Sequence, residues 1–309
     1  MNNTKKASKT TPQLSIVFPN WNGVQDALEY LGSIQNSSYS REKIEVILVD
    51  NHSEDDSVSQ VRKKFPEVKI IELDKNYGPA YARNRGIEQA QGEYVFCSDN
   101  DQNLDTNCLQ IMADYLRGAN RLQINSDIGI VGAKVLSKTK PHQIVSCGYT
   151  FNRWLGAESG RKDCKEIKEC DWIAGCCMMF RNSLVNEIGL FDEKFFFFAE
   201  DADFCLRTKK AEYKVVSLPE AVVYHGKNKS QALETLLEPG FGKYYDYYKA
   251  KFRLILKHSR LLQKVTSIAL HLTVLSLIRY LTGKEESLVL KTRALVSVIA
   301  DFSPRQNAQ

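Results

Sequence analysis

Apolar runs and amphipathic segments alternate along the first hundred residues of this chain. The apolar runs expected to form strands are residues 14–18, 44–49, 68–73 and 94–97. The segments with helical spacing are residues 24–35, 57–65 and 79–90. Strands that alternate with helices of about 10 residues indicate βαβ units, whose right-handed crossovers bring the loops after the strands to one edge. The pattern predicts an α/β fold with a Rossmann-like, mostly parallel central sheet and flanking helices.

The pattern is less regular after residue 100. The further expected elements are strands over 128–132 and 214–218 and a short helix over 203–210. Because no long Pro/Gly/Ser linker precedes residue 230, we expect one domain over residues 13–230. A polar lead-in over residues 1–12 is expected to be disordered, since it lacks the apolar core of a signal peptide. Residues 231–309 are expected to form a helical extension.

Net charge separates this extension from the rest of the chain. Residues 241–309 hold 12 Lys/Arg against 4 Asp/Glu, a surplus of +8, and because the whole chain carries +5, the first 240 residues sum to −3. An acidic main domain argues against general nucleic-acid binding, and a basic tail favours a local anionic contact. The apolar fraction of 43% and the charged fraction of 26% are ordinary for a soluble protein.

Eight cysteines are scattered along the chain, and no pair has the C-x-x-C spacing of a zinc or redox site. Cys97, Cys176 and Cys177 lie within apolar runs, where a free cysteine behaves as a small hydrophobic residue. The usage fits a chain with reduced cysteines in the cytosol.

The apolar run at 94–97 ends abruptly in Ser98-Asp99-Asn100-Asp101. Two carboxylates one residue apart at a strand end suit a divalent cation such as Mg²⁺ or Mn²⁺, which prefers oxygen ligands. An Asp-rich turn before a helix would have the same composition. By itself this motif fits both interpretations.

Five short blocks follow one another at compatible spacing: VFPNWN (17–22), VDN (49–51), NYG (76–78) with ARNRG (82–86), SDND (98–101) and FAEDAD (198–203). Together they resemble glycosyltransferase family 2, the inverting enzymes of the glycosyltransferase A fold, and within it the rhamnosyltransferase-like branch. The resemblance runs from residue 14 to about residue 229. Asn100 stands where some members carry a third aspartate.

The resemblance implies a nucleotide-sugar donor held by the loops that follow the strands. The implied donor-binding residues are Pro19, Asn20, Asn22, Asp50, Asn76, Gly78, Arg83, Asp99 and Lys227. Asp50 would accept from a pyrimidine N–H, which suits an acceptor-only carboxylate; the alternative is a helix cap for the segment from Asp56. For Arg83 the alternative is a surface salt bridge.

The resemblance also implies a metal held by Asp99, Asp101 and His225. Asp101 would ligate Mn²⁺ or Mg²⁺ between the two phosphates, Asp99 would contact the ribose or the metal shell, and His225 would be a further ligand. Lys227 and Lys229 could reach the diphosphate, although lysines in such a loop are equally expected to be solvent-exposed.

Asp201 is the expected catalytic base, because inverting transfer requires a carboxylate that deprotonates the acceptor hydroxyl. The aromatic run at 195–198 would partly desolvate it and raise its pKa, although these aromatics are expected to lie mainly in the core. The alternative for Asp201 is the N-cap of the following helix. Asp203 is expected to be a first-turn residue favoured by the helix dipole.

The acceptor and sugar pocket is expected to include Trp172, Gly175 and Glu200. Gly175 would let the backbone approach a ligand closely. Trp172 offers an apolar face to a sugar ring, and an ordinary core position explains it equally well.

The extension begins with a basic, aromatic-rich segment, residues 242–258, followed by 14 mainly apolar residues at 265–278. A bilayer span requires about 20 apolar residues. We therefore expect amphipathic helices that contact an anionic membrane surface through residues 241–280. The alternatives are helices packed on the main domain or in a dimer interface.

These observations favour a cytoplasmic, metal-dependent inverting glycosyltransferase at the inner face of the cell membrane. It would move a sugar, with rhamnose as the family-level expectation, from a UDP- or dTDP-linked donor to a glycan or lipid-linked acceptor in bacterial surface polysaccharide synthesis. A sugar nucleotidyltransferase would need a Gly-rich phosphate loop after the first strand, which residues 19–23 do not supply. A non-catalytic, membrane-docked sugar- or nucleotide-binding module would have no need to keep Asp99, Asp101, Asp201 and His225 together.

Overall fold

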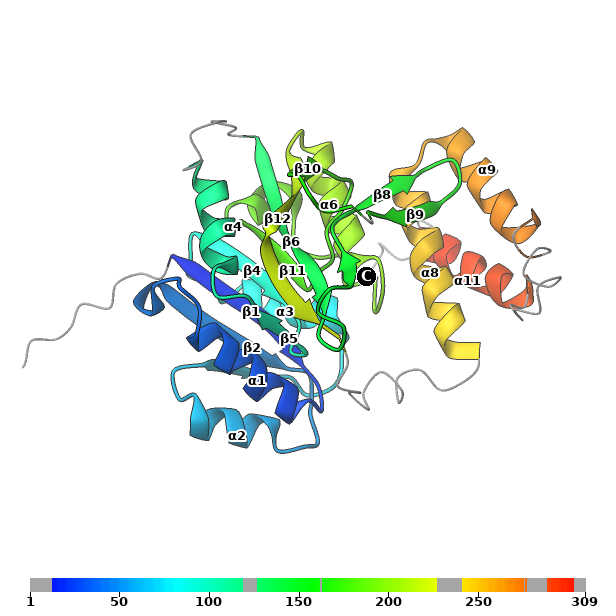
Figure 1. Ribbon diagram of the computed structural model, residues 1–309. Helices are drawn as coiled ribbons and strands as arrows, with labels where there is room; N and C mark the ends of the chain where they lie inside the picture. Colours follow the sequence, from blue (N-terminus) through cyan, green and yellow to red (C-terminus); the bar gives the residue numbers. More distant parts are fainter. Residues whose placement is uncertain are drawn as a thin grey trace, which may run out of the picture.

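The computed structural model describes residues 13–118, 127–161, 163–226, 241–274, 276 and 288–302. The lead-in at 1–12 and the residues Lys227 and Lys229 lie outside these ranges. Within them, helices flank a central sheet, and three C-terminal helices stand together at one side of it (Figure 1).

The strands are β1 (Leu14–Asn20), β2 (Ile44–Asp50), β3 (Lys69–Glu72), β4 (Tyr94–Ser98), β5 (Gln102–Leu104), β6 (Ile128–Ser137), β7 (Ile144–Ser146), β8 (Tyr149–Asn152), β9 (Ala157–Gly160), β10 (Lys168–Glu169), β11 (Cys177–Arg181) and β12 (Lys214–His225). The helices are α1 (Val24–Gln35), α2 (Ser57–Lys64), α3 (Pro79–Ile87), α4 (Cys108–Arg117), α5 (Leu184–Ile188), α6 (Glu200–Lys210), α8 (Phe241–His258), α9 (Leu261–Leu272) and α11 (Leu288–Asp301), with a 3-10 turn at Arg41–Lys43.

The main sheet runs β10-β12-β6-β11-β4-β1-β2-β3, with β5 paired to β12 and β7 paired to β6. The half formed by β4, β1, β2 and β3 is parallel, as the alternating pattern predicts. β11 lies antiparallel between β4 and β6, so the other half is mixed. The α/β architecture with a parallel half-sheet is confirmed, and the carboxyl ends of β1, β2 and β4 meet at one edge.

Most element positions agree with the sequence pattern, and the exceptions lie after residue 100. The helix at 24–35 has the expected bounds. The helix expected at 203–210 begins earlier, at Glu200, because Phe198 and Ala199 adopt positive φ values of 70° and 63° and turn the chain sharply into it. The strand expected at 214–218 continues to His225 after a shift in register.

Helix α8 packs on the main domain. Its buried side chains are Tyr248, Ala250, Phe252, Arg253, Leu254 and Ile255. Lys257 and His258 near its end contact the buried carboxylate of Asp203 on α6, at 2.8 and 2.7 Å. Tyr248 and Phe252 of α8 are thus used in packing, as in the alternative of helices packed on the main domain, and the expected membrane contact of residues 241–280 stays a prediction. Among the described helices, none is both long and apolar enough to cross a bilayer.

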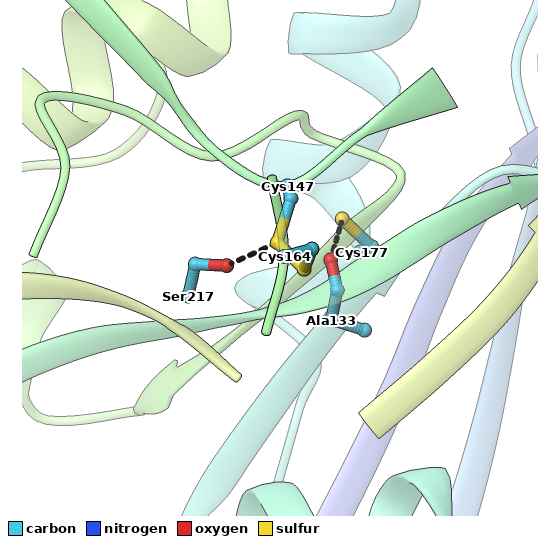
Figure 2. The surroundings of a disulfide bond; sticks show 5 residues. All are labelled: Ala133, Cys147, Cys164, Cys177 and Ser217. Atoms are coloured by element: carbon cyan, nitrogen blue, oxygen red, sulfur yellow. Dashed lines mark hydrogen bonds between the residues drawn. A yellow bond between two sulfur atoms is a disulfide. The ribbon is translucent and has the colours of Figure 1, made fainter. Parts of the chain in front are cut away.

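A disulfide joins Cys147 and Cys164 (Figure 2), whereas the sequence analysis expected reduced cysteines throughout. The hairpin β8–β9 lies between these two residues and reverses the chain, which brings positions 17 apart in sequence together. The other six cysteines are free and buried, as their apolar surroundings suggest.

Candidate functional site

A cavity of about 550 Å³ opens at the carboxyl edge of the parallel strands. One side, here called the strand-end wall, consists of Pro19, Asn20, Trp21, Asn51, Asn76, Gly78, Pro79, Arg83, Asp99, Asn100, Asp101, His225 and Gly226. The other side, the distal wall, comes from segments far along the chain: Glu158, Trp172, Ala174, Gly175, Cys176, residues 196–202, Tyr247, Ala250 and Lys251. Its position matches the edge where open α/β sheets bind ligands.

Asparagine side chains tie the loops of the strand-end wall together. Asn20 accepts a hydrogen bond from Asn100 Nδ2 at 2.7 Å, which joins the loops after β1 and β4. Asn51 Nδ2 donates to Asn76 Oδ1 at 2.8 Å, which joins the loop after β2 to the turn before α3. Neither Asn51 nor Asn100 was among the expected site residues, although both lie inside the motifs that carry the resemblance. An amide can donate and accept at once, so these residues can link neighbouring loops that carboxylates could not.

Asp50 and Asn22 lie behind this wall and do not line the cavity. Asp50 accepts from Asn20 Nδ2 at 3.1 Å and from the backbone N–H and hydroxyl of Ser53 at 2.8 and 2.6 Å. It is not a helix cap, because the residue at the N-cap of α2 is Asp56. Asn22 accepts from the backbone N–H of Glu54 at 2.7 Å. Both residues hold the two loops in place.

Gly78 has a conformational requirement as well as a place in the wall. Its φ is +84°, and a Cβ there would lie 2.4 Å from the carbonyl oxygen of Phe196. Only glycine satisfies both conditions without a shift of the backbone. The turn before α3 can therefore approach the segment that leads to α6.

Arg83 is buried, with 3% of its side chain exposed, so the alternative of a surface salt bridge is wrong. Its Nη1 donates to Glu200 Oε1 at 2.8 Å and its Nη2 to Asp99 Oδ1 at 2.6 Å. A Cβ on Gly175 would lie 3.2 Å from the guanidinium carbon, so Gly175 is what lets the backbone pass over Arg83. One planar cation thus joins the strand-end wall to the distal wall.

Asp99, Asp101 and His225 converge as the resemblance implies. His225 Nε2 lies 3.1 Å from Asp101 Oδ1 and 3.5 Å from Asp99 Oδ2. This Nε2 atom is buried and has no hydrogen bond of good geometry with a described residue, although the His225 side chain as a whole is 26% exposed. Burial would raise the pKa of Asp99, but Arg83 and His225 lower this pKa to about 2, so the carboxylate is ionised.

These donors fit a divalent cation. The ligand atoms of Asp99, His225 and Cys176 lie within 4.8 Å of one another. A contact with Cys177 and burial raise the pKa of Cys176 well above the usual thiol range. A protonated thiol is a poor ligand. Without the thiol, the donors beside the His225 imidazole are the carboxylates of Asp99 and, outside that group of three, Asp101 at 3.1 Å; such a set suits Mn²⁺ or Mg²⁺.

Asp201 lies in the first turn of α6 and lines the cavity. Its Oδ2 accepts from the backbone N–H of Gly175 at 2.9 Å, and its Oδ1 from that of Ala202 at 2.7 Å. Burial first, and then the neighbouring carboxylate Glu200, raise the pKa of Asp201 to about 7. The N-cap of the helix is Ala199, so the capping alternative for Asp201 is wrong. A carboxyl group that titrates near neutral pH is well suited to proton transfer.

Asp203 has a different role from its neighbour Asp201. It is fully buried and faces away from the cavity toward α8. Burial would raise the pKa of Asp203, but His258, Arg207 and Lys257 lower this pKa to about 2. From the sequence, Asp203 was expected only to favour the helix dipole; this role was missed because two of its cationic partners, Lys257 and His258, lie more than fifty positions later.

The distal wall contains aromatic side chains that the sequence placed mainly in the core. Only Phe195 of the aromatic run is fully buried; Phe196 is 43% exposed, and residues 196–198 line the cavity. The positive φ of Phe198 turns this segment outward. Trp172 is buried and stacks on Tyr149 with ring centroids 3.9 Å apart, as a core position predicts; it also lines the cavity, and its contact with a sugar stays a prediction.

The chain is similar to known proteins in sequence and in fold. The sequence model of the family described as Glycosyl transferase family 2 matches residues 15–189. An uncharacterized glycosyltransferase of Bacillus subtilis, YwdF, is 29% identical over 215 residues, which cover 69% of this chain and 74% of that protein. The N-acetylglucosaminyl-diphospho-decaprenol L-rhamnosyltransferase of Mycobacterium tuberculosis is 26% identical over 205 residues, 60% of this chain and 67% of that protein.

Two solved structures have a similar fold. S. aureus TarS 1-349 in complex with UDP-GlcNAc superposes with a TM-score of 0.63 at 18% identity, covering 94% of this chain and 80% of that one. The mannosyltransferase PcManGT of Pyrobaculum calidifontis, in complex with GDP-Man and Mn²⁺, gives a TM-score of 0.57 at 17% identity over 95% of this chain and 89% of that one. At such identities the likeness concerns the fold, which is that of the glycosyltransferase A class.

Proposed function

Because the chain belongs to glycosyltransferase family 2, we propose that it is a metal-dependent inverting glycosyltransferase of bacterial surface polysaccharide synthesis. It transfers a sugar from a UDP- or dTDP-linked donor to a glycan or lipid-linked acceptor. Rhamnose is the proposed sugar, because a rhamnosyltransferase with a lipid-diphosphate acceptor is among the relatives. The other two functions considered from the sequence gain no support from the cavity.

The observation that carries this proposal is the position and state of Asp201. It shares one cavity with the cluster of Asp99, Asp101 and His225, and its raised pKa lets it exchange a proton near pH 7. A nucleotidyltransferase or a binding module would not need a carboxylate with this property. An inverting glycosyltransferase does need one, to remove the proton from the attacking hydroxyl.

Each wall then has a part in the reaction. The strand-end wall holds the nucleotide between its asparagine-linked loops, with Pro19, Asn20, Asn76 and Gly78 against the donor. A divalent cation held by Asp99, Asp101 and His225 would supply positive charge for the departing diphosphate. Arg83 fixes Asp99 and Glu200 relative to each other. On the distal wall Asp201 takes the acceptor proton, and its two backbone N–H contacts keep the carboxylate aimed into the cavity.

We also propose a peripheral contact with an anionic membrane on the cytoplasmic side, now restricted to the outer helices. Exposed apolar side chains gather on α9 and α11: Leu261, Leu262, Val265, Leu288, Val289, Val296 and Ile299. The chain from residue 241 onward carries a surplus of +8. Apolar side chains on basic helices suit the surface of an anionic bilayer. Vesicles of anionic lipid should sediment the full-length protein at low salt, and a protein left in the supernatant would contradict this contact.

The proposed reaction is tested by the substitution Asp201→Asn. We expect the single-turnover transfer rate, at saturating donor and Mn²⁺, to fall by about 10²- to 10⁴-fold, because the amide cannot accept the proton. Below pH 7 the wild-type rate should rise with pH as the carboxylate loses its proton, and the variant should lack this dependence. Donor affinity, measured by calorimetry, should be unchanged.

Asp55→Asn is the matched control. Asp55 also accepts backbone N–H bonds, from Val24 at 3.1 Å and Ser57 at 3.0 Å, but it lies outside the cavity. If replacing any aspartate that accepts backbone N–H bonds slowed transfer, the two variants would be slowed equally. An Asp201→Asn rate within a few-fold of wild type would show that another group takes the proton.

A further inference from the structure

The cation Lys251 on α8 lines the cavity but forms no ion pair with a described residue. Its Nζ donates to the hydroxyl of Tyr247 at 2.8 Å and lies 4.9 Å from the centre of that ring. An ammonium group has three N–H donors, and a neutral phenol satisfies one of them. Lys251 is half-buried and lines the cavity, so its ammonium group occupies a partly desolvated position there.

The charge of Lys251 is not balanced by its surroundings. The buried imidazole of His271 has its pKa lowered to about 4, by burial first and by Lys251 second. Glu158 on β9 lines the same cavity, but it is exposed and makes no ion pair with Lys251. Solvent screens an exposed carboxylate more strongly than a half-buried cation. The distal wall therefore offers a positive charge among aromatic side chains.

Helix α8 holds Lys251 in a fixed place. Lys257 and His258, further along the same helix, contact the fully buried Asp203. Tyr247 packs edge-on against Phe198, with ring centroids 5.9 Å apart, beside the turn that leads to Asp201. Lys251 and Asp201 thus line the same cavity from α8 and α6, two helices that are in contact with each other.

We propose that Lys251, together with Tyr247, binds a phosphate group of the acceptor. This inference rests on the proposed function, because it takes Asp201 to mark the acceptor side. The donor diphosphate already has its cation site at Asp99, Asp101 and His225, on the other wall. A second positive charge in the same cavity, on a different element from that cation site, is suited to an acceptor that is itself a phosphate ester. The compact ammonium group of a lysine can bind such a phosphate as a point charge.

Binding is measured by calorimetry on the full chain, with UDP and Mn²⁺ at saturation so that the donor site is filled. Geranyl phosphate and glycerol 3-phosphate represent a lipid and a polyol source of the phosphate, and geraniol and glycerol are the uncharged partners. Wild type should bind at least one phosphate and neither alcohol. Lys251→Met should weaken phosphate binding by about 10- to 100-fold, which is the effect expected for a charge-assisted hydrogen bond. Lys251→Arg should retain most of it.

Lys249→Met is the matched control, because Lys249 lies on the same helix and does not line the cavity. Equal phosphate affinity in Lys251→Met and Lys249→Met, or no phosphate binding by wild type, would overturn the proposal. A loss of UDP affinity in Lys251→Met would assign the lysine to the donor and would also overturn it. Since binding requires no transfer, a failure here is distinguishable from a failure of the proposed function, which the transfer rate of Asp201→Asn tests separately.

Discussion

The two walls of the cavity are built in different ways. The strand-end wall comes mainly from loops that directly follow β1, β2 and β4, neighbouring strands of one parallel half-sheet. The distal wall collects a β-hairpin, the segment before β11, the first turn of α6 and a helix that begins at residue 241. Backbone pairing fixes the first wall, whereas side-chain packing and ion pairs hold the second wall together.

The strand-end wall therefore follows from the fold itself, whereas the distal wall depends on features of the individual enzyme. Any parallel half-sheet brings the loops after its strands to one edge. The strand-end wall is therefore suited to the part of the donor that all such enzymes share. The distal wall can change through its helix and hairpin without disturbing the sheet. Arg83 is the principal side chain that joins the two, through Asp99 on one side and Glu200 on the other.

The largest effect should come from breaking the attachment of the distal wall. Asp203→Asn leaves Lys257 and His258 facing a neutral amide in a buried position, and we expect the free energy of unfolding to fall by about 3–5 kcal/mol. Urea denaturation measures this. Because the folded-state pKa of Asp203 is lowered to about 2, its contribution is present above the unfolded-state pKa of about 3.9 and is lost as the pH falls toward 2. The variant should lack that loss.

Asp192→Asn serves as the control, since Asp192 contacts the same Lys257 at 2.7 Å but its side chain is 23% exposed. An exposed pair contributes about 1 kcal/mol or less. If the two variants were equally stable, the buried pair would not be what holds α8. Among folded molecules of Asp203→Asn, UDP affinity should match wild type while transfer falls, because the strand-end wall does not depend on α8.

The same contrast explains how much could be predicted from the sequence. The parallel strands and α1 follow from periodicity, whereas the convergence of Asp99, Asp101 and His225 was implied by the family resemblance. The docking of α8 does not, because Asp203 and His258 are 55 positions apart and neither position carries a local signal. The disulfide was missed for a related reason: the hairpin between Cys147 and Cys164 is short and mostly polar, so its strands are not evident from the pattern.

The aromatic run at 195–198 illustrates a further limit. Composition indicates burial, and Phe195 is indeed buried. The positive φ values of Phe198 and Ala199 then turn the chain, so that Phe196 becomes exposed at the cavity. Such backbone conformations are uncommon in residues other than glycine. They depend on the surrounding packing, and no residue type in the run predicts them.

A smaller effect should come from the strand-end wall, where the metal ligands act on donor affinity and leave the fold intact. Calorimetry with UDP in Mn²⁺ and in EDTA should show at least about tenfold weaker binding without the metal, which is about 1.4 kcal/mol. Asp101→Asn and His225→Ala should each reduce this metal dependence, because His225 Nε2 and Asp101 Oδ1 lie 3.1 Å apart without another good partner for the imidazole. His142→Ala, an exposed histidine outside the cavity, should behave as wild type. Equal UDP affinity in Mn²⁺ and EDTA would remove the metal from this wall, and the three side chains would then be a hydrogen-bonded cluster that shapes the donor site by itself.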